Sequence, residues 1–230
     1  MRRDCQVLLI DADDTLWENN PRFKRTITAF VELIASLGHE PGFVRDRVNR
    51  AEEENIQRRG YGTASFLLTL EQVYTELAGA RASEAVRREI RGLRRLLIDA
   101  PLRLFEGVED TLAYLSGRHR LFLFSKGNDG EQRQKVESSG LAAHFEAVEI
   151  VPEKNEAAYR GVVERRGLGA GAVWMVGDSP RSDINPALAA GLNAIHIECP
   201  DPWHFEQEAI RPGEGELLRL KRFRELREHF

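Results

Sequence analysis

Cysteine is scarce in this sequence, which has only Cys5 and Cys199 among 230 residues. Two cysteines this far apart lack metal-ligand spacing and are too few for a disulfide framework. We therefore expect neither a cysteine-based metal site nor a disulfide-stapled fold. Because both residues lie in or beside apolar runs, we expect them to be small buried hydrophobic residues.

Long hydrophobic runs are also missing. The first apolar run, Val7–Ile10, ends at Asp11 and is too short for a signal peptide or a spanning helix, and no other run is long enough. The net charge of −4 gives no general attraction to nucleic acid or to an anionic membrane. We expect a cytoplasmic globular protein that binds neither. The sequence gives no indication of its oligomeric state.

Lysine is the third scarce residue, with 5 lysines against 28 arginines. Some sites need a compact ammonium that a planar guanidinium cannot replace, so a lysine in this chain is more informative than usual. Lys126 and Lys154 both follow predicted strands. These two lysines are therefore candidates for a functional site.

Five short apolar runs predict β-strands. Most are apolar at every position, as in strands whose two faces are both covered. Helical patterns lie between the later runs, and each predicted helix ends close to a glycine. This alternation predicts an α/β fold with a doubly wound parallel sheet. The predicted strands are Val7–Ile10, Leu121–Phe124, Val148–Val151, Val173–Val176 and Ala194–Ile197, and the helices between them are Asp129–Ser139, Asn155–Arg166 and Ser182–Ala190.

The long interval between the first two strands contains no convincing strand. We interpret it as an inserted helical domain over residues 18–100, with a core formed by residues 1–17 and 101–230. Val108–Ser116 predicts a core helix, and Glu214–Glu228 predicts a final charged helix. The amphipathic patterns of the insertion are Phe23–Leu37, Phe43–Arg58, Ala64–Leu77 and Ser83–Ile98.

Polar side chains follow four of the predicted strands. Ligand sites in such sheets lie just beyond the carboxyl ends of the strands, so these side chains are expected to meet at one edge. No single motif among them is persuasive alone, but all four agree. The residues are Asp11 and Asp13 after the first strand, Ser125, Lys126 and Gly127 after the second, Lys154 after the third, and Asp178 with Asp183 after the fourth.

The acidic residues of this set favour metal-assisted phosphoryl transfer. Asp11, Asp13 and Asp178 would repel one another if packed together, so a divalent cation is needed. Oxygen ligands favour a hard ion, and Mg²⁺ fits best. The Asp11 carboxylate can attack phosphorus to form an aspartyl-phosphate. Asp13 can protonate the leaving alcohol and later deprotonate water.

The remaining residues of the set are suited to binding phosphate. Ser125, Lys126, the amides near Gly127 and the Lys154 ammonium can hold phosphoryl oxygens and stabilise developing charge. Asp183 is expected to orient Lys154 or a metal-bound water. For each of these residues a helix cap or turn is the alternative interpretation. We prefer that alternative for Asp14 and Ser179.

The four motifs together resemble the haloacid dehalogenase superfamily of hydrolases. They are DADDTL at Asp11–Leu16, LFLFS at Leu121–Ser125, Lys154, and GDSPRSD at Gly177–Asp183. The resemblance implies a Rossmann-like core and an inserted helical cap of the C1 type that opens and closes over the site. It also implies that Asp11 is the nucleophile and Asp13 the acid/base. Magnesium would be held by Asp11, Asp178 and the Asp13 main-chain carbonyl.

Asp13 decides which branch of the superfamily the sequence resembles. The metal-free 2-haloacid dehalogenases of the superfamily lack an aspartate at this position, so its presence points to phosphate chemistry. We expect a magnesium-dependent phosphatase that hydrolyses a small phosphorylated metabolite. A phosphomutase or a phosphonatase remains an alternative, although Lys24, the lysine of the inserted region, has the pattern of a surface residue.

Two alternatives come from other classes of protein. A phosphoacceptor signalling module would carry its acceptor aspartate after the third strand, where this sequence has Val151-Pro152-Glu153-Lys154. A non-catalytic binding protein would have no need to retain all the acidic groups. Neither alternative is favoured.

The substrate itself is not identified by the sequence. Specificity is expected from the inserted domain, and the segment 58–63 is the candidate because its two glycines permit a tight loop. Its residues Arg59, Tyr61 and Thr63 could bind a polar substrate. An ordinary turn between helices is the alternative. For Trp203 and His204, after the last predicted strand, we expect packing rather than a role in the site.

Overall fold

A computed structural model of the chain describes residues 5–99 and 101–230. The chain forms two compact units. The sheet unit contains Met1–Glu18 and Leu102–Phe230, and the helical unit contains Asn19–Pro101. The inserted helices thus interrupt the sheet unit shortly after its first strand. Each unit has a hydrophobic core of its own.

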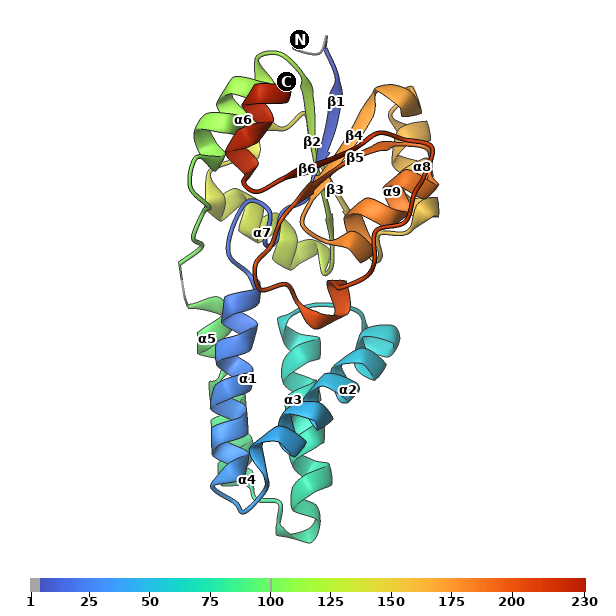
Figure 1. Ribbon diagram of the computed structural model, residues 1–230. Coiled ribbons are helices and arrows are strands. Elements are labelled where there is room, and N and C mark those ends of the chain that lie inside the picture. The colour runs from blue at the N-terminus through green and yellow to red at the C-terminus, as the bar shows by residue number, and fades with distance from the viewer. Residues whose placement is uncertain (1–4, 100) are drawn as a thin grey trace. The chain divides into compact units, whose positions relative to one another are not determined.

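The sheet unit is built on six parallel strands in the order β3-β2-β1-β4-β5-β6 (Figure 1). The chain winds outward from β1 to β3 and then crosses back to β4, so the direction of winding reverses between β1 and β4. The predicted α/β doubly wound, Rossmann-like sheet is therefore confirmed. The strands are β1 (Val7–Ile10), β2 (Arg120–Lys126), β3 (Ala147–Val151), β4 (Val173–Gly177), β5 (Asn193–Ile197) and β6 (Leu217–Leu220).

Helices cover both faces of this sheet, which explains why its strands are apolar throughout. In β1, Leu8 and Ile10 pack into one hydrophobic cluster, while Val7 and Leu9 pack into the cluster on the opposite face. Successive side chains of a strand point to opposite faces, so both sets are buried. One face is covered by α6 (Val108–Ser116), α7 (Asp129–Ser139) and α10 (Leu226–His229), and the other by α8 (Glu156–Arg165) and α9 (Asn185–Ala189).

Helix α7 has clear start and stop signals in its sequence. The Asn128 side chain accepts a hydrogen bond from the Glu131 N–H at 3.1 Å and so caps the first turn. Gly140 ends the helix with a φ of 75°, a left-handed conformation that glycine adopts without strain. Both ends of the predicted helix 129–139 are therefore confirmed.

The predicted charged helix over Glu214–Glu228 is wrong. This segment forms β6, which pairs with β5, followed by the 3₁₀ turn η6 (Phe223–Glu225) and the short helix α10. Leu220 packs into the core of the sheet unit, and Leu218 packs against it. Pairing with β5 and burial of these leucines outweigh the helical propensity of the charged residues.

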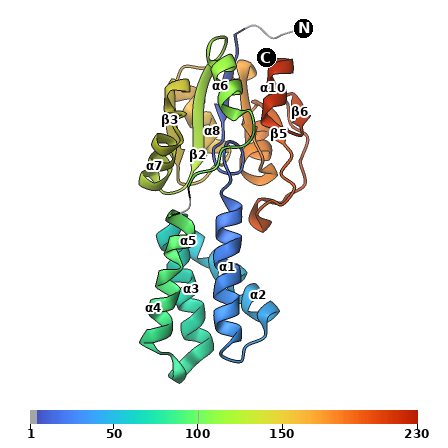
Figure 2. The same cartoon turned by 90° about the vertical axis from the view of Figure 1, so that its left-hand side faces the viewer.

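The helical unit packs its helices around a shared apolar core (Figure 2). The side chain of Glu40 accepts hydrogen bonds from Gly42 and Phe43 and so caps α2. The single helix predicted over Ser83–Ile98 is instead two short helices, since the first ends at Gly92, a residue of low helix propensity. The helices are α1 (Asn20–Ala35), α2 (Pro41–Arg59), α3 (Thr63–Ala78), α4 (Glu84–Gly92) and α5 (Arg94–Ile98), with the 3₁₀ turn η1 (Gly79–Arg81) after α3.

Two expectations from the sequence concern the burial of the cysteines and the presence of membrane-spanning helices. Cys5 is exposed and Cys199 is half-buried, so the prediction of two buried cysteines is wrong. Cys5 lies outside the sheet, two positions before the first residue of β1. As for membrane spans, the helices described in residues 5–99 and 101–230 are all too short or too polar to cross a bilayer.

Candidate active site

Two strand ends place acidic groups side by side at the edge of the sheet. The backbone N–H of Asp11 donates to the carbonyl of Val176 at 2.9 Å, which continues the β1–β4 ladder beyond β1. Asp178 directly follows β4. Both aspartates therefore flank the point where the winding of the sheet reverses, where ligands bind in folds of this type.

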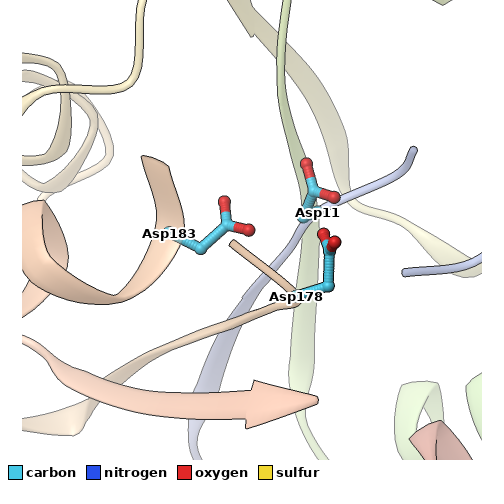
Figure 3. Close-up of side chains that lie close together, drawn as sticks. All are labelled: Asp11, Asp178 and Asp183. Atoms are coloured by element: carbon cyan, nitrogen blue, oxygen red, sulfur yellow. The ribbon is translucent and has the colours of Figure 1, made fainter. Parts of the chain in front are cut away.

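Asp183 joins these two aspartates from the π-helical turn η4 (Pro180–Ile184). Figure 3 shows the three carboxylates converging. One oxygen of each lies within 4.8 Å of the others, and all three residues are buried. The acidic group is thus formed by Asp11, Asp178 and Asp183.

The glycine of the GDSPRSD motif makes room for Asp183. A Cβ added at Gly177 would lie 2.2 Å from Oδ2 of Asp183, far inside contact distance. The same Oδ2 accepts a hydrogen bond from the Ser179 N–H at 3.0 Å. The Ser179 hydroxyl in turn caps η4 by accepting from the Ser182 N–H at 2.9 Å, as expected for a cap. The motif therefore fixes Asp183 against the backbone at the end of β4.

Lys154 lies among these carboxylates. It is buried, and its Nζ donates to Oδ1 of Asp11 at 2.5 Å and to Oδ1 of Asp183 at 2.7 Å. The next residue, Asn155, caps α8 by accepting from the Ala158 N–H at 3.0 Å, which fixes the backbone beside the lysine. Asp183 thus orients Lys154 toward Asp11.

One ammonium does not balance three buried carboxylates. Burial raises the pKa of Asp11 to about 7, against the opposing effect of Lys154. Burial, followed by the charge of Asp11, raises the pKa of Asp178 well above its ordinary value. The pKa of Lys154 is raised despite its burial, because Asp11 and Asp183 favour its charged form. A cluster of oxygen ligands with excess negative charge is suited to a hard divalent cation such as Mg²⁺.

The Asp13 side chain belongs to a different group of contacts. Its carboxylate accepts hydrogen bonds from the Trp17 indole at 2.7 Å, from Gln132 at 3.0 Å and from Lys135 at 2.9 and 2.8 Å. Burial raises the pKa of Asp13, but the charge of Lys135 and these hydrogen bonds outweigh it, and the pKa lies below its usual value. The expected crowding of Asp13 with Asp11 and Asp178 is therefore wrong, because Asp183 takes that place.

A compact turn after β1 directs Asp13 away from the acidic cluster. The Leu16 N–H donates to the Ala12 carbonyl at 2.9 Å, and the Asp14 N–H donates to the Trp17 carbonyl at 2.8 Å. Asp14 has a φ of 63°, a left-handed conformation that aspartate tolerates better than most residues. We therefore interpret Asp14 as a turn residue, as the sequence suggested.

The last two residues of β2, Ser125 and Lys126, direct their side chains to two different sides. The buried Ser125 hydroxyl lies 2.9 Å from the Gln132 amide nitrogen, on the side of Asp13. Lys126 instead donates to Ser182 at 2.7 Å and to Glu206 at 2.5 Å. Successive residues of a strand point in opposite directions, which separates these two side chains.

Gly127 also differs from the phosphate-binding expectation. Its N–H donates to the carbonyl of Val151 at 3.0 Å, so this amide already has a partner in the protein. The Lys126 ammonium likewise has carboxylate and hydroxyl partners. For Ser125 and Lys154, phosphate binding stays a prediction.

Several residues at the site carried no recognised signal in the sequence. Two of them, Gln132 and Lys135, lie three positions apart on α7 and so share one side of the helix. Lys135 is one of only 5 lysines, which is the signal that could have found it. The others are His196 and Glu206. His196 donates to the Asp178 carbonyl, and Glu206 accepts from Ser179 and Ser182.

The residues proposed for substrate specificity all lie in the helical unit. Arg59 is the last residue of α2, and Thr63 is the first residue of α3. Tyr61 lies between them, flanked by two glycines with φ values of 75° and 125°. Arg59 is exposed, while Tyr61 and Thr63 are half-buried. Their role in substrate binding stays a prediction.

The aromatic residues after β5 form a local group. Trp203 and Phe205 pack edge to face with ring centroids 5.0 Å apart, and His204 stacks on Phe205 at 4.0 Å. The following residue, Glu206, is the buried partner of Lys126. Packing of Trp203 and His204 is thus as expected, and it places a buried carboxylate beside η4.

Comparison with known proteins identifies the family of this chain. A model of the family described as haloacid dehalogenase-like hydrolase matches residues 5–191. The chain is also similar to N-acylneuraminate-9-phosphatase of Homo sapiens, with 24% identity over 203 residues that cover 82% of this chain and 80% of that protein. The family match includes the strand ends from Asp11 to Asp183.

Solved structures share the fold over almost the whole chain. A haloacid dehalogenase-like family hydrolase from Xanthomonas campestris is 27% identical with a TM-score of 0.83, covering 98% of this chain and 96% of that one. The HAD-hydrolase YfnB from Bacillus subtilis, bound to magnesium, is 17% identical with a TM-score of 0.67, covering 98% of both chains. The fold of this chain therefore has relatives among the solved structures of hydrolases.

Proposed function

Because this chain belongs to the haloacid dehalogenase-like hydrolase family, we propose that it is a magnesium-dependent phosphatase of a small phosphorylated metabolite. The observation that carries the proposal is the pair of aspartates after β1. Asp11 is buried against Lys154, and Asp13, two residues later, is bound by Lys135. These separate contacts support a role for Asp11 as the nucleophile and for Asp13 as the acid/base. The similarity to an N-acylneuraminate-9-phosphatase supports this reaction class.

The first half of the reaction forms an aspartyl-phosphate. A carboxylate oxygen of Asp11 forms a bond to phosphorus while the bond from phosphorus to the ester oxygen breaks. The electron pair of that bond goes to the leaving oxygen, which takes a proton from Asp13. The free alcohol leaves, Asp11 carries the phosphoryl group, and Asp13 is a carboxylate.

The second half releases phosphate. Asp13 accepts a proton from a water molecule as the water oxygen forms its bond to phosphorus. The bond from phosphorus to Asp11 breaks, and its electron pair returns to the carboxylate. Inorganic phosphate leaves, and both aspartates recover their starting protonation states.

Phosphoryl oxygens would be bound by Ser125 and Lys154. Both groups are buried, and both reach the side of the sheet edge where Asp11 or Asp13 lies. An ammonium and a hydroxyl fixed in advance stabilise the charge that develops on phosphorus-bound oxygens. Lys126 and Gly127 have no part in this proposal, because other protein groups bind them.

The acidic cluster would hold the magnesium ion. Asp11, Asp178 and the main-chain carbonyl of Asp13 would supply the ligands, and Asp183 would keep Lys154 in place. When bound, the ion neutralises charge on the phosphoryl group and makes phosphorus more electrophilic. A fold relative bound to magnesium supports this assignment.

Substrate selection is proposed for the helical unit. Arg59, Tyr61 and Thr63 offer a guanidinium and two hydroxyls on a short glycine-containing loop, which suits a polar substrate. A metal-free dehalogenase is disfavoured, because Asp13 supplies a proton that the loss of a halide ion does not need. We therefore expect a phosphate ester.

The function is tested by a screen of phosphorylated metabolites for phosphate release. Purified protein is incubated with each compound and MgCl₂, and inorganic phosphate is measured. Release from at least one compound, lost with EDTA and recovered with excess Mg²⁺, is the expected result. Turnover that is unaffected by EDTA contradicts the magnesium assignment, and the absence of release from every compound contradicts the phosphatase.

A further inference from the structure

We propose that Lys135 and Gln132 of α7 are positioning residues that hold the carboxylate of Asp13 where it exchanges a proton with the leaving group. This inference rests on the proposed phosphatase reaction, in which Asp13 is the acid/base. It concerns residues that lie 119 and 122 positions away from Asp13 in the sequence. Neither residue is placed in contact with the phosphoryl group itself.

Lys135 makes the charged part of this arrangement. Its Nζ lies 2.9 Å from Oδ1 and 2.8 Å from Oδ2 of Asp13, so it holds both carboxylate oxygens. The side chains of Lys135 and Asp13 are only 22% and 23% exposed. An ion pair this sheltered is screened less by solvent than a surface pair, and its geometry is more strongly enforced.

Gln132 links Asp13 to the end of β2. Its Nε2 lies 3.0 Å from Oδ2 of Asp13, 2.9 Å from the Ser125 hydroxyl and 3.0 Å from the Lys126 carbonyl. The side chain is buried, so few other orientations are open to it. One amide group therefore ties the acid/base to a proposed phosphate-binding serine.

The turn that carries Asp13 fixes its backbone but supplies few donors to its carboxylate. Asp13 lies in the turn after β1, and the next residue has a positive φ. Among the described residues, the Trp17 indole is the one donor to its carboxylate from the same turn, at 2.7 Å. The remaining donors come from α7. Since an error of about 1 Å in a catalytic group can cost about 10²-fold in rate, loss of the α7 donors should weaken proton transfer.

The other residues of α7 argue against a purely structural role for Lys135. The buried residues of this helix are Gln132 and Val136, and Val136 carries its contact with the core. The arginine next to Gln132, Arg133, is exposed and pairs within the helix with Asp129 at 3.0 Å. A positive charge on α7 can thus be accommodated on its surface, and Lys135 is instead turned to Asp13.

The test compares Lys135→Met with Arg133→Met, a matched loss of a paired cation from the same helix. Release of the alcohol or phenol is measured in a single turnover, with an alkyl phosphate and with p-nitrophenyl phosphate. General acid catalysis contributes about 10²–10⁴-fold, so Lys135→Met should slow release from the alkyl phosphate by roughly 10- to 100-fold. It should slow release of p-nitrophenol by less than about 3-fold, because that leaving group departs without a proton.

Three further results belong to the same experiment. Arg133→Met should match the wild type on both substrates. Lys135→Arg should recover part of the lost rate, since it restores a cation, and KM should change little because Lys135 does not bind the substrate. Equal slowing on both substrates, or no slowing on the alkyl phosphate, overturns the inference while leaving the phosphatase proposal intact.

A structural measurement keeps the inference testable without any activity. In a crystal structure of Lys135→Met, we expect the Asp13 side chain to leave the position that it has beside Trp17 and Gln132. An unchanged Asp13 rotamer in that variant contradicts the positioning role, whatever the substrate of the enzyme. Failure of the wild type to release phosphate from any compound is a separate result and contradicts the proposed function.

Discussion

The ammonium of Lys154 lies 2.5 Å from Oδ1 of Asp11, although 143 residues separate them in the sequence. Both side chains are buried, and Lys154 is held from its other side by Asp183. A lysine in this position shields the Asp11 oxygen and fixes its orientation. The next three predictions depend on this pair and on the groups around it.

Replacement of Asp11 by asparagine should abolish turnover without loss of the fold. The amide is a much weaker nucleophile than a carboxylate, so we expect kcat to fall by about 10⁴-fold or more. The melting temperature without metal should not decrease, because one of three repelling buried carboxylates is removed. Phosphate release and thermal unfolding measure the two effects. Asp129→Asn, on the surface of α7, is the control, and substantial residual activity in Asp11→Asn rejects the nucleophile.

Replacement of Lys154 by methionine should destabilise the metal-free protein. Removing one partner of a buried ion pair leaves its carboxylates uncompensated, which costs about 3–5 kcal/mol of unfolding free energy. Mg²⁺ should restore part of this loss, because the ion balances the same charges. Urea unfolding of the wild type and the variant, each with and without Mg²⁺, measures both effects. A variant as stable as the wild type without metal contradicts the charge argument.

Replacement of Gly177 by alanine should displace Asp183. The added Cβ would lie 2.2 Å from Oδ2 of Asp183, so the carboxylate must move and lose its bond to the Ser179 N–H. We expect a loss of about 1–3 kcal/mol in unfolding free energy and a lower kcat, because Lys154 loses an orienting partner. Gly117→Ala is the matched control, since its nearest neighbouring atom is 3.9 Å away. Equal effects of the two substitutions on stability and kcat contradict the role of Gly177.

The sheet could be predicted because its signals are local. Four apolar residues in β1, buried on both faces, leave little choice but a central strand. The cap at Asn128 and the glycine at Gly140 define α7 within its own sequence. β6 has no such signal, since it is an edge strand that pairs only with β5 and has charged residues around it. Its formation depends on a surface that the rest of the fold creates.

The site could be predicted where topology alone brings residues together. Asp11, Ser125, Lys154 and Asp178 lie at or just beyond the carboxyl ends of parallel strands, so the strand order alone brings them to one edge. The direction in which a side chain points depends on packing, which the order of the strands does not determine. The alternation of β2 turns Lys126 toward Glu206, a residue 80 positions further on in a loop, and no local pattern indicates this pairing.

A buried carboxyl in the helical unit leads to a prediction about pH and stability. Glu52 on α2 is buried, and its Oε2 has no hydrogen-bond partner among the described residues. Burial raises the pKa of this group from 4.5 to about 8. The folded protein therefore holds a proton that the unfolded chain releases above pH 4.5. Stability is lost as the pH rises from about 4.5 to about 8, by up to several kcal/mol, and the loss is constant at higher pH.

Replacement of Glu52 by glutamine keeps the shape of the side chain and removes its ionisation. The variant should therefore gain stability relative to the wild type at pH 8, by about 1–4 kcal/mol, and gain little at pH 5. Urea unfolding followed at both pH values measures the difference. Glu53→Gln is the control, because this neighbouring residue is exposed and its substitution should change stability little at either pH. If Glu52→Gln shifts stability equally at pH 5 and pH 8, the carboxyl is not protonated in the folded protein, and its burial must be compensated in another way.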